Sequence, residues 1–326
     1  MAGIGFPVTR IGFPVTGSGS GPPSAPTISA SGGAVTLGGT ITWPAVAGAT
    51  SYTLYRDGAS AGTVTSPYTE VAADLGYRAL TMKSVGPGGT SVASNTLRWN
   101  PTALVEIFDL TTLTPGAITT ITGRKAGFAP TQAVSGQRPV ASATSFNGTP
   151  GLTFDGVDDC LAATCDFSAY STQRIVAAMI DTTAALSVAI ELTAATATTN
   201  GSFNIVPNLS GTALGSNARG TVGFGGKTCT DTLAAAKYCS FCVDTSIAAA
   251  VQFIRVNGVA QALTNFSASC AAGNFSNAAL NIGSRNNGAS LPWAGTFGGA
   301  IIFMSGTAQD ADLTDAEAFV KSVTGL

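Results

Sequence analysis

Short runs in which apolar and polar residues alternate recur along most of the chain. In the first hundred residues they are Thr40–Trp43, Ser51–Arg56 and Tyr77–Ser84. Such alternation places the apolar side chains on one face of a half-buried strand. Further strands are predicted at Val105–Asp109, Arg174–Ile180, Leu186–Glu191, Phe203–Val206, Thr221–Phe224, Tyr238–Val243 and Val251–Val256, and the continuously apolar run Gly299–Met304 suits a strand covered on both faces. The pattern predicts an all-β protein.

The segment Gly151–Cys160 combines a strand with a turn. Leu152–Phe154 alternates, and Asp155-Gly156 is a turn dipeptide because glycine tolerates positive φ. Asp158 and Asp159 follow directly, so two carboxylates lie beside a tight turn. These carboxylates can cap backbone N–H groups. Together with Asp155 they can also form an oxygen-rich rim for Ca²⁺ or a sugar; no other cofactor is expected.

Two further local signals concern the end of the chain. Asn257-Gly258 is a strong two-residue hairpin signal. Thr314 and Glu317 have the spacing of a capping box, which predicts a short helix. The residues expected to fix this helix to the sandwich are Phe319, Val320 and Val323.

Residues 27–100 contain two distinctive phrases, Trp43–Tyr55 and Leu75–Ser94. In these phrases the segment resembles a fibronectin type III domain. The resemblance implies an immunoglobulin-like sandwich with Trp43 in the core and Tyr77 at a tyrosine corner. We interpret this domain as a spacer.

Several phrases occur in order along residues 101–326. The central one is Phe154–Asp159 after Asn147–Leu152. The others are Phe108–Leu110, Leu113–Gly116, Gln137–Pro139, Ile254–Gly258, Leu280–Gly283, Trp293–Gly295 and Leu313–Glu317. In these phrases the segment resembles the concanavalin-A-like lectin/glucanase family, in the laminin-G-like version common in bacterial and phage surface proteins. The resemblance implies a jelly-roll sandwich with a short C-terminal helix. This fold serves binders, enzymes and structural proteins alike.

Residues 1–26 form an extended arm and a linker. The hexad Ile-Gly-Phe-Pro-Val-Thr occurs at Ile4–Thr9 and again at Ile11–Thr16, and Gly17–Pro26 supplies a spacer that is first flexible and then stiff. Apolar side chains on a segment with no core of its own need a partner surface. We expect docking through Ile4, Phe6, Val8, Ile11, Phe13 and Val15. Two copies indicate two equivalent pockets or a strand added to a neighbour's sheet edge, and an accidental duplication in a tail is the alternative.

The composition limits the possible partners. The net charge is −2 and charged residues make up 10% of the chain, so nucleic acid and anionic membranes are not expected partners. No apolar run is long enough for membrane insertion. Met1–Arg10 lacks the pattern of a secretory signal, so export by lysis is expected, with the six cysteines reduced. Because the chain has no histidine and Cys239 and Cys242 have no second matching pair, no zinc site is expected.

Catalysis is not predicted. Retaining glucanases of the wider superfamily need paired carboxylates about 5–5.5 Å apart. Glu106, Glu191 and Glu317 are not paired in this way. The chain also lacks a nucleophile elbow and a histidine base.

One loop has the composition of a sugar site. Ser284–Trp293 combines Arg285, Asn286 and Asn287 with an aromatic residue, Trp293. Sugars offer an apolar face and a ring of hydroxyl groups to such residues. Asp158 and Asp159 are expected near this loop, and burial of Trp293 in the core is the alternative.

These features favour a structural protein on the surface of a bacteriophage or phage-like particle, such as a fibre, spike or capsid decoration. It would be present in many copies, dock on other virion proteins through residues 1–16, and display the lectin-like domain towards a host polysaccharide. A bacterial adhesin is the second interpretation, and a polysaccharide depolymerase the third.

Overall fold

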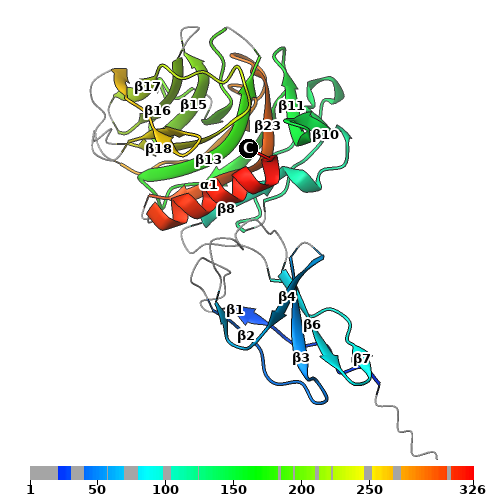
Figure 1. Ribbon diagram of the computed structural model, residues 1–326. Helices are drawn as coiled ribbons and strands as arrows, with labels where there is room; N and C mark the ends of the chain where they lie inside the picture. The colour runs from blue at the N-terminus through cyan, green and yellow to red at the C-terminus, as the bar shows by residue number, and fades with distance from the viewer. Residues whose placement is uncertain are drawn as a thin grey trace, which may run out of the picture. The chain divides into compact units, whose positions relative to one another are not determined.

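The computed structural model describes most of the chain after residue 20. The described residues are 21–30, 40–56, 58–69, 80–97, 104–123, 125–182, 185–193, 195–209, 213–221, 223–245, 252–266, 273–306 and 310–326. They divide into a smaller compact unit, built from segments within residues 21–97, and a larger one that includes residues 104–326 (Figure 1). The arm residues Ile4, Phe6, Val8, Ile11, Phe13 and Val15 lie outside the described residues, as does Tyr77.

The described residues between 21 and 97 form two small antiparallel sheets. One has the order β1-β2-β5, and the other has the order β4-β3-β6-β7. Two antiparallel sheets are what the predicted sandwich requires. The strands are β1 (Ser29–Ala30), β2 (Thr40–Thr42), β3 (Ser51–Arg56), β4 (Ala59–Val64), β5 (Tyr68–Thr69), β6 (Leu80–Gly86) and β7 (Gly89–Thr90).

The core of this small sandwich follows from the alternation in its strands. Ile41, Leu54 and Met82 are fully buried, each flanked by more exposed neighbours on its strand. Trp43 is 5% exposed and meets Tyr52 edge-on, with the ring centroids 5.4 Å apart. Trp43 is therefore a core residue, as predicted.

The larger unit is a sandwich of two antiparallel sheets. The first has nine strands, in the order β20-β19-β18-β13-β23-β11-β10-β9, with β8 also paired to β23. Its strands are β8 (Leu104–Asp109), β9 (Gly116–Ala117), β10 (Val140–Phe146), β11 (Thr149–Asp155), β13 (Thr172–Asp181), β18 (Lys237–Asp244), β19 (Ile254–Val256), β20 (Val259–Ala260) and β23 (Ala294–Ser305). Two 3-10 turns, η3 (Leu110–Thr112) and η4 (Ser135–Gln137), interrupt its connections.

The second sheet has seven strands, in the order β12-β22-β14-β15-β16-β17-β21. These are β12 (Leu161–Asp166), β14 (Ile190–Leu192), β15 (Ser202–Leu209), β16 (Ala213–Arg219), β17 (Phe224–Cys229), β21 (Thr264–Phe266) and β22 (Asn277–Ile282). The predicted all-β class, with jelly-roll-type packing of sheet on sheet, is confirmed.

The two sheets of the larger unit enclose one apolar core. Phe203 and Ile205 on β15 face Phe303 and Ile301 of β23 in the same buried cluster. On the other face of the nine-stranded sheet lies α1 (Asp310–Thr324), which buries Phe319 and Val320 against β13 and β23 (Figure 1). As predicted for a strand covered on both faces, β23 is buried over almost its whole length. No described helix has the length and apolar character needed to cross a membrane.

Some local predictions were wrong. The helix begins at Asp310 rather than at a capping box, and Thr314 Oγ1 donates to the carbonyl oxygen of Asp310 (2.9 Å). Glu317 instead accepts from Ser240 Oγ (2.6 Å) and pairs with Arg255 (3.0 Å), because its side chain faces the sheet.

Other differences concern strand boundaries. The strand predicted at Thr221–Phe224 starts only at Phe224, because Gly223 has a φ of +95° and belongs to the turn. The strand predicted at Leu186–Glu191 is shorter and later, at Ile190–Leu192. The Asn257-Gly258 hairpin is confirmed, with φ values of +50° and +78° between β19 and β20.

Candidate functional site

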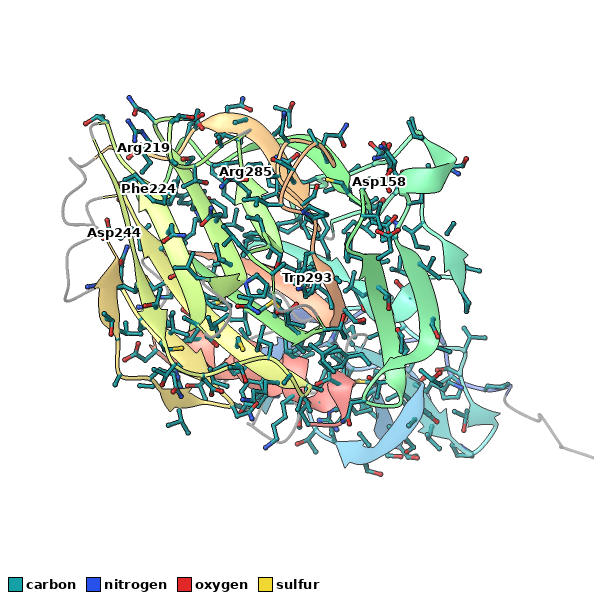
Figure 2. The ribbon with its side chains drawn as sticks, turned by 90° about the horizontal axis from the view of Figure 1, so that it is seen from above. Asp158, Arg219, Phe224, Asp244, Arg285 and Trp293 are labelled. Carbon is teal, nitrogen blue, oxygen red and sulfur yellow. The ribbon has the colours of Figure 1, made fainter. Side chains whose placement is uncertain are left out.

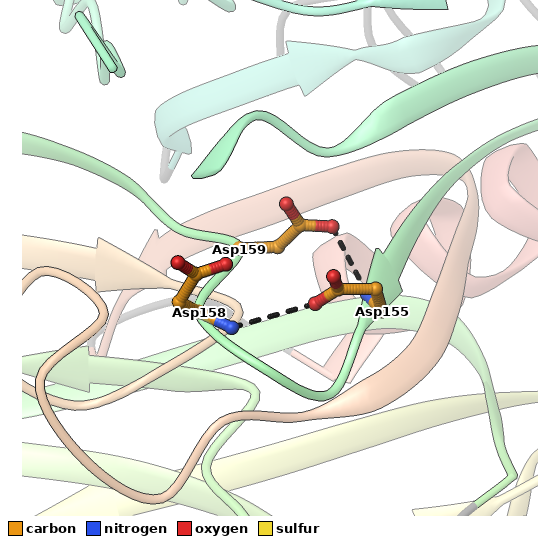
Figure 3. Close-up of side chains that lie close together, drawn as sticks. All are labelled: Asp155, Asp158 and Asp159. Atoms are coloured by element: carbon orange, nitrogen blue, oxygen red, sulfur yellow. Dashed lines mark hydrogen bonds between the residues drawn. The ribbon is translucent and has the colours of Figure 1, made fainter. Parts of the chain in front are cut away.

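A carboxylate turn follows strand β11, and Figure 3 shows its three aspartates. The backbone N–H of Asp155 donates to Asp159 Oδ2 (3.0 Å). Asp155 Oδ1 accepts from the N–H groups of Val157 (2.8 Å) and Asp158 (3.4 Å). The prediction that these side chains cap backbone N–H groups is therefore confirmed for Asp155 and Asp159.

The same three carboxylates form one cluster. A ligand atom from each of Asp155, Asp158 and Asp159 lies within 4.8 Å of the others. Asp159 is 5% exposed, and burial raises its pKa to about 6. The hydrogen bond from Asp155 N–H opposes this rise, and the charges of Asp155 and Asp158 add to it. Closely spaced oxygens of this kind fit a hard cation such as Ca²⁺, which would stabilise the ionised form of Asp159.

The predicted polar loop lies directly against this turn. A Cβ placed on Gly288 would be 2.7 Å from the backbone oxygen of Asp158, so only glycine allows this approach. The N–H of Gly288 donates to Ser284 Oγ (2.8 Å), and that of Asn287 donates to Asn281 Oδ1 (2.9 Å). The structure thus brings together two segments that are some 130 positions apart in the sequence.

The loop presents two amide side chains to solvent. Asn286 and Asn287 have φ values of +51° and +52°, and both residues are exposed. Asparagine tolerates this left-handed conformation better than most residues do. Asn286 and Asn287 are therefore exposed residues in the loop segment that lies against the carboxylate turn.

Arg285 connects the loop to the sheet beneath it. Its Nε donates to Glu191 Oε2 (2.8 Å) and its Nη2 donates to Glu191 Oε1 (3.0 Å). Glu191 is fully buried on β14 and also accepts from the N–H and Oγ1 of Thr196, both at 2.7 Å. These bonds anchor the loop to β14 through the guanidinium of Arg285.

The predicted contact between Trp293 and a sugar was wrong. It is fully buried, and its indole N–H donates to Asp181 Oδ1 (3.1 Å). Its ring centroid lies 4.6 Å from that of Phe297 and 5.7 Å from that of Phe154, among the interior side chains (Figure 2). A side chain in this position cannot stack on a sugar, so Trp293 belongs to the core.

Beneath the loop lies a buried polar row that the sequence analysis did not identify. Asn281, Glu191, Asn204 and Asn217 are register partners on β22, β14, β15 and β16. Asn217 Nδ2 donates to Asn204 Oδ1 (2.8 Å), and Asn281 Nδ2 donates to the carbonyl oxygen of Thr193 (3.0 Å). The available signal was a polar residue between two apolar ones, as in Ile190-Glu-Leu, Phe203-Asn-Ile and Leu280-Asn-Ile. Sequence alone could not show that four such positions share one row.

The described cysteines are buried thiols. Cys160, Cys165, Cys229, Cys239 and Cys242 are free, and Cys270 lies outside the described residues. Cys239 and Cys242 are three positions apart on β18, so their side chains point to opposite faces of the sheet. Burial raises the pKa of Cys242 to about 12. This pair therefore cannot act together as metal ligands.

Among known proteins, only solved structures resemble this chain in the comparisons made. No protein-family model matches the sequence, and no curated protein matches it. A Trypanosoma rangeli sialidase, solved with a difluorinated KDN, is 11% identical with a TM-score of 0.46; the match covers 70% of this chain and 34% of the sialidase. The chain thus spans about a third of that enzyme's length.

Two other solved structures show similar values. Domain 4 of an extracellular arabinanase from Geobacillus stearothermophilus, in complex with arabinotriose, is 12% identical with a TM-score of 0.46, covering 66% of this chain and 98% of that domain. The binding domain of botulinum neurotoxin serotype D is 6% identical with a TM-score of 0.42, covering 66% of this chain and 51% of that one. The likeness is one of fold alone.

Proposed function

We propose that this protein is a non-enzymatic, saccharide-binding surface protein. Its binding rim is formed by the carboxylate turn Asp155–Asp159 and the loop Asn286–Gly288. The observation that carries this proposal is the close approach of Gly288 to the backbone oxygen of Asp158, which brings the loop with two exposed asparagines against the carboxylate turn. Amide and carboxylate groups together offer the donors and acceptors that sugar hydroxyls require.

An apolar side chain completes this rim. Val157 lies in the carboxylate turn and is 69% exposed. The C–H face of a pyranose could pack on it while the hydroxyl groups bond to Asn286, Asn287 and Asp158. Each single site would be weak, because sugar hydroxyls exchange one set of hydrogen bonds with water for another. Display in many copies would raise the avidity.

The proposal excludes hydrolysis at this rim. Glu191 is fully buried and bonded to Arg285. Asp159 has a raised pKa, as a general acid would, but it is 5% exposed and accepts the N–H of Asp155. Neither group is free to reach a glycosidic oxygen.

We further propose that the protein is a virion component of a bacteriophage or phage-like particle. The support is the order of its parts: a duplicated apolar arm, a flexible spacer, a small sandwich and a larger sandwich with a polar rim. A bacterial adhesin could use the same rim. Labelling intact particles with antibody to this protein distinguishes these contexts, because only a virion component is found on purified particles.

The saccharide rim can be tested without disturbing the backbone. Glycine accepts the positive φ of Asn286 and Asn287, so the double variant N286G/N287G removes the amides alone. Binding of the full chain to a panel of purified bacterial surface polysaccharides would be measured on a biosensor surface. The proposal expects the double variant to lose binding about tenfold or more, while the matched control N257G, at another positive-φ asparagine, binds normally. Unchanged binding by N286G/N287G, or no binding by the unaltered protein, would overturn the proposal.

A further inference from the structure

The four-stranded sheet of the smaller unit ends on an open strand. Its order is β4-β3-β6-β7, and β4 has no partner on its outer side among the described strands. The sequence of β4 is Ala-Ser-Ala-Gly-Thr-Val, with no charged residue and no proline, and its residues are exposed apart from the half-buried Val64. Natural proteins protect such edges, because unpaired backbone N–H and C=O groups readily accept another strand.

A hollow lies at one end of this strand. It has a volume of about 500 Å³, and its lining includes Trp43, Tyr52, Thr63, Val64 and Ser66. Tyr52 is the register partner of Val64, and Tyr52 shares a face of β3 with the fully buried Leu54. The hollow therefore opens between the two sheets of the small sandwich. A strand added beside β4 would place every second side chain on the same face as the hollow.

The duplicated hexad has the pattern of such a strand. In Ile11–Thr16 the apolar residues Ile11, Phe13 and Val15 are spaced by two, as are Gly12, Pro14 and Thr16. In an extended chain the side chains of each set lie on one face of the strand. The backbone N–H and C=O groups of the same set point to one lateral edge. The edge of Ile11, Phe13 and Val15 keeps every N–H donor, whereas the opposite edge contains the proline, which has none. Proline in sheets is found where its edge faces solvent.

The lengths of the hexad and of its acceptor agree. The hexad and β4 each have six residues. Facing β4, the hexad would form the outermost strand, with Phe13 or a neighbouring apolar side chain over the hollow. Its proline edge would then prevent any further strand from joining.

The described chain begins close to this hollow. Gly21, Pro22 and Pro23 line a second hollow of about 570 Å³ together with Thr50, and Thr50 also lines the first one. Only Gly17–Ser20 separates Gly21 from the nearer hexad. Four extended residues span up to about 14 Å. A short flexible tether of this kind gives an effective concentration in the millimolar range.

We propose that Ile11–Thr16 adds to the open edge of β4 in its own chain, with Ile11, Phe13 and Val15 on the face of the hollow and one of them covering it beside Trp43 and Tyr52. The nearer hexad thus completes the small sandwich. Ile4–Thr9, with the same sequence, is left to pair in the same way with a second acceptor. This proposal does not depend on the saccharide rim.

Hydrogen exchange of the full chain tests the proposal. Because the second hexad could replace the first, the double variant F6D/F13D is needed, which puts a charge at the centre of both apolar sets. The matched control T9D/T16D puts the same charges on the opposite edge. We expect the amides of Ala59–Val64 to exchange at least about tenfold faster in F6D/F13D than in the unaltered protein, with the control and the conservative variant F6L/F13L unchanged.

Each outcome decides the proposal. Equal exchange in F6D/F13D and in the unaltered protein would overturn it. Protection of β4 that increases with protein concentration would assign the edge to the arm of a second copy and overturn the assignment to the chain's own arm. Protection that appears only after adding a polysaccharide or another protein would overturn it as well. Protection that is independent of concentration and is lost in F6D/F13D supports it.

Discussion

Arg285 holds the buried carboxylate of Glu191 at two points, Nε to Oε2 at 2.8 Å and Nη2 to Oε1 at 3.0 Å. Planar, two-point pairs of this kind fix orientation as well as supplying attraction. Arg285 immediately precedes Asn286 and Asn287, whereas Glu191 lies on β14 in the seven-stranded sheet. The pair therefore connects the exposed rim to the polar row of the sheet beneath it.

Replacing Arg285 should destabilise the larger unit. In Arg285→Met the fully buried Glu191 loses its cation, so we expect a loss of roughly 3 kcal/mol in the free energy of unfolding. Arg285→Lys should recover only part of this loss, because lysine cannot form the two-point contact. Chemical denaturation measures both. If E191M/R285M is no more stable than R285M, the loss does not come from an uncompensated buried charge.

Asp159 should make the larger unit more stable in mild acid than at neutral pH. Its pKa is about 6 in the folded protein, above the ordinary value of 3.8, because burial disfavours the charged form. The folded state then binds more protons than the unfolded state between about pH 4 and pH 6, so stability falls as the pH rises through this range. Asp159→Asn should reduce this decrease of stability with rising pH. Asp166→Asn, at a fully exposed carboxylate, is the control. Thermal melts at several pH values with EDTA present would test this, and an unchanged slope in Asp159→Asn would contradict it.

Trp293 should behave as a core residue. Trp293→Ala removes a fully buried ring packed on Phe154 and Phe297, so we expect a loss of about 3–5 kcal/mol in stability. Trp293→Phe keeps most of the apolar contact but loses the bond to Asp181, and should cost about 1–2 kcal/mol. Measured melting points separate the two variants. A normal melting point with lost polysaccharide binding in Trp293→Ala would restore the rejected surface role.

The architecture could be predicted from the sequence because it depends on local patterns. Alternation located β3, β13 and β18 within a few residues, and Asn257-Gly258 fixed a hairpin through its backbone preference. The site could be predicted only in part. The turn and the loop were identified by composition, but the role of Trp293 depended on which side of a strand end it occupies. The polar row depended on the register between strands, which a single sequence does not encode.

The same reasoning explains the failure at the helix. The spacing of Thr314 and Glu317 matched a capping box, yet Glu317 faces Ser240 and Arg255 of the sheet. A tertiary contact thus outweighed a local preference, since a cap contributes only about 1 kcal/mol. Spacing alone could not have shown this contact.

The two hexads should be separable by truncation. Removing residues 1–9 leaves Ile11–Thr16 to complete β4, so β4 should keep its protection from exchange while the protein loses attachment to its assembly. Removing residues 1–16 should abolish both, because no apolar strand remains to cover the edge. The larger unit should melt at the same temperature in both truncated proteins, since its two buried apolar clusters are built from its own sheets and helix. Particle occupancy, measured by quantitative labelling, and exchange of Ala59–Val64 give independent readouts.

Normal occupancy after removal of residues 1–16 would show that the arm is not the attachment device. Lost protection after removal of residues 1–9 would show that the nearer hexad is not the strand beside β4.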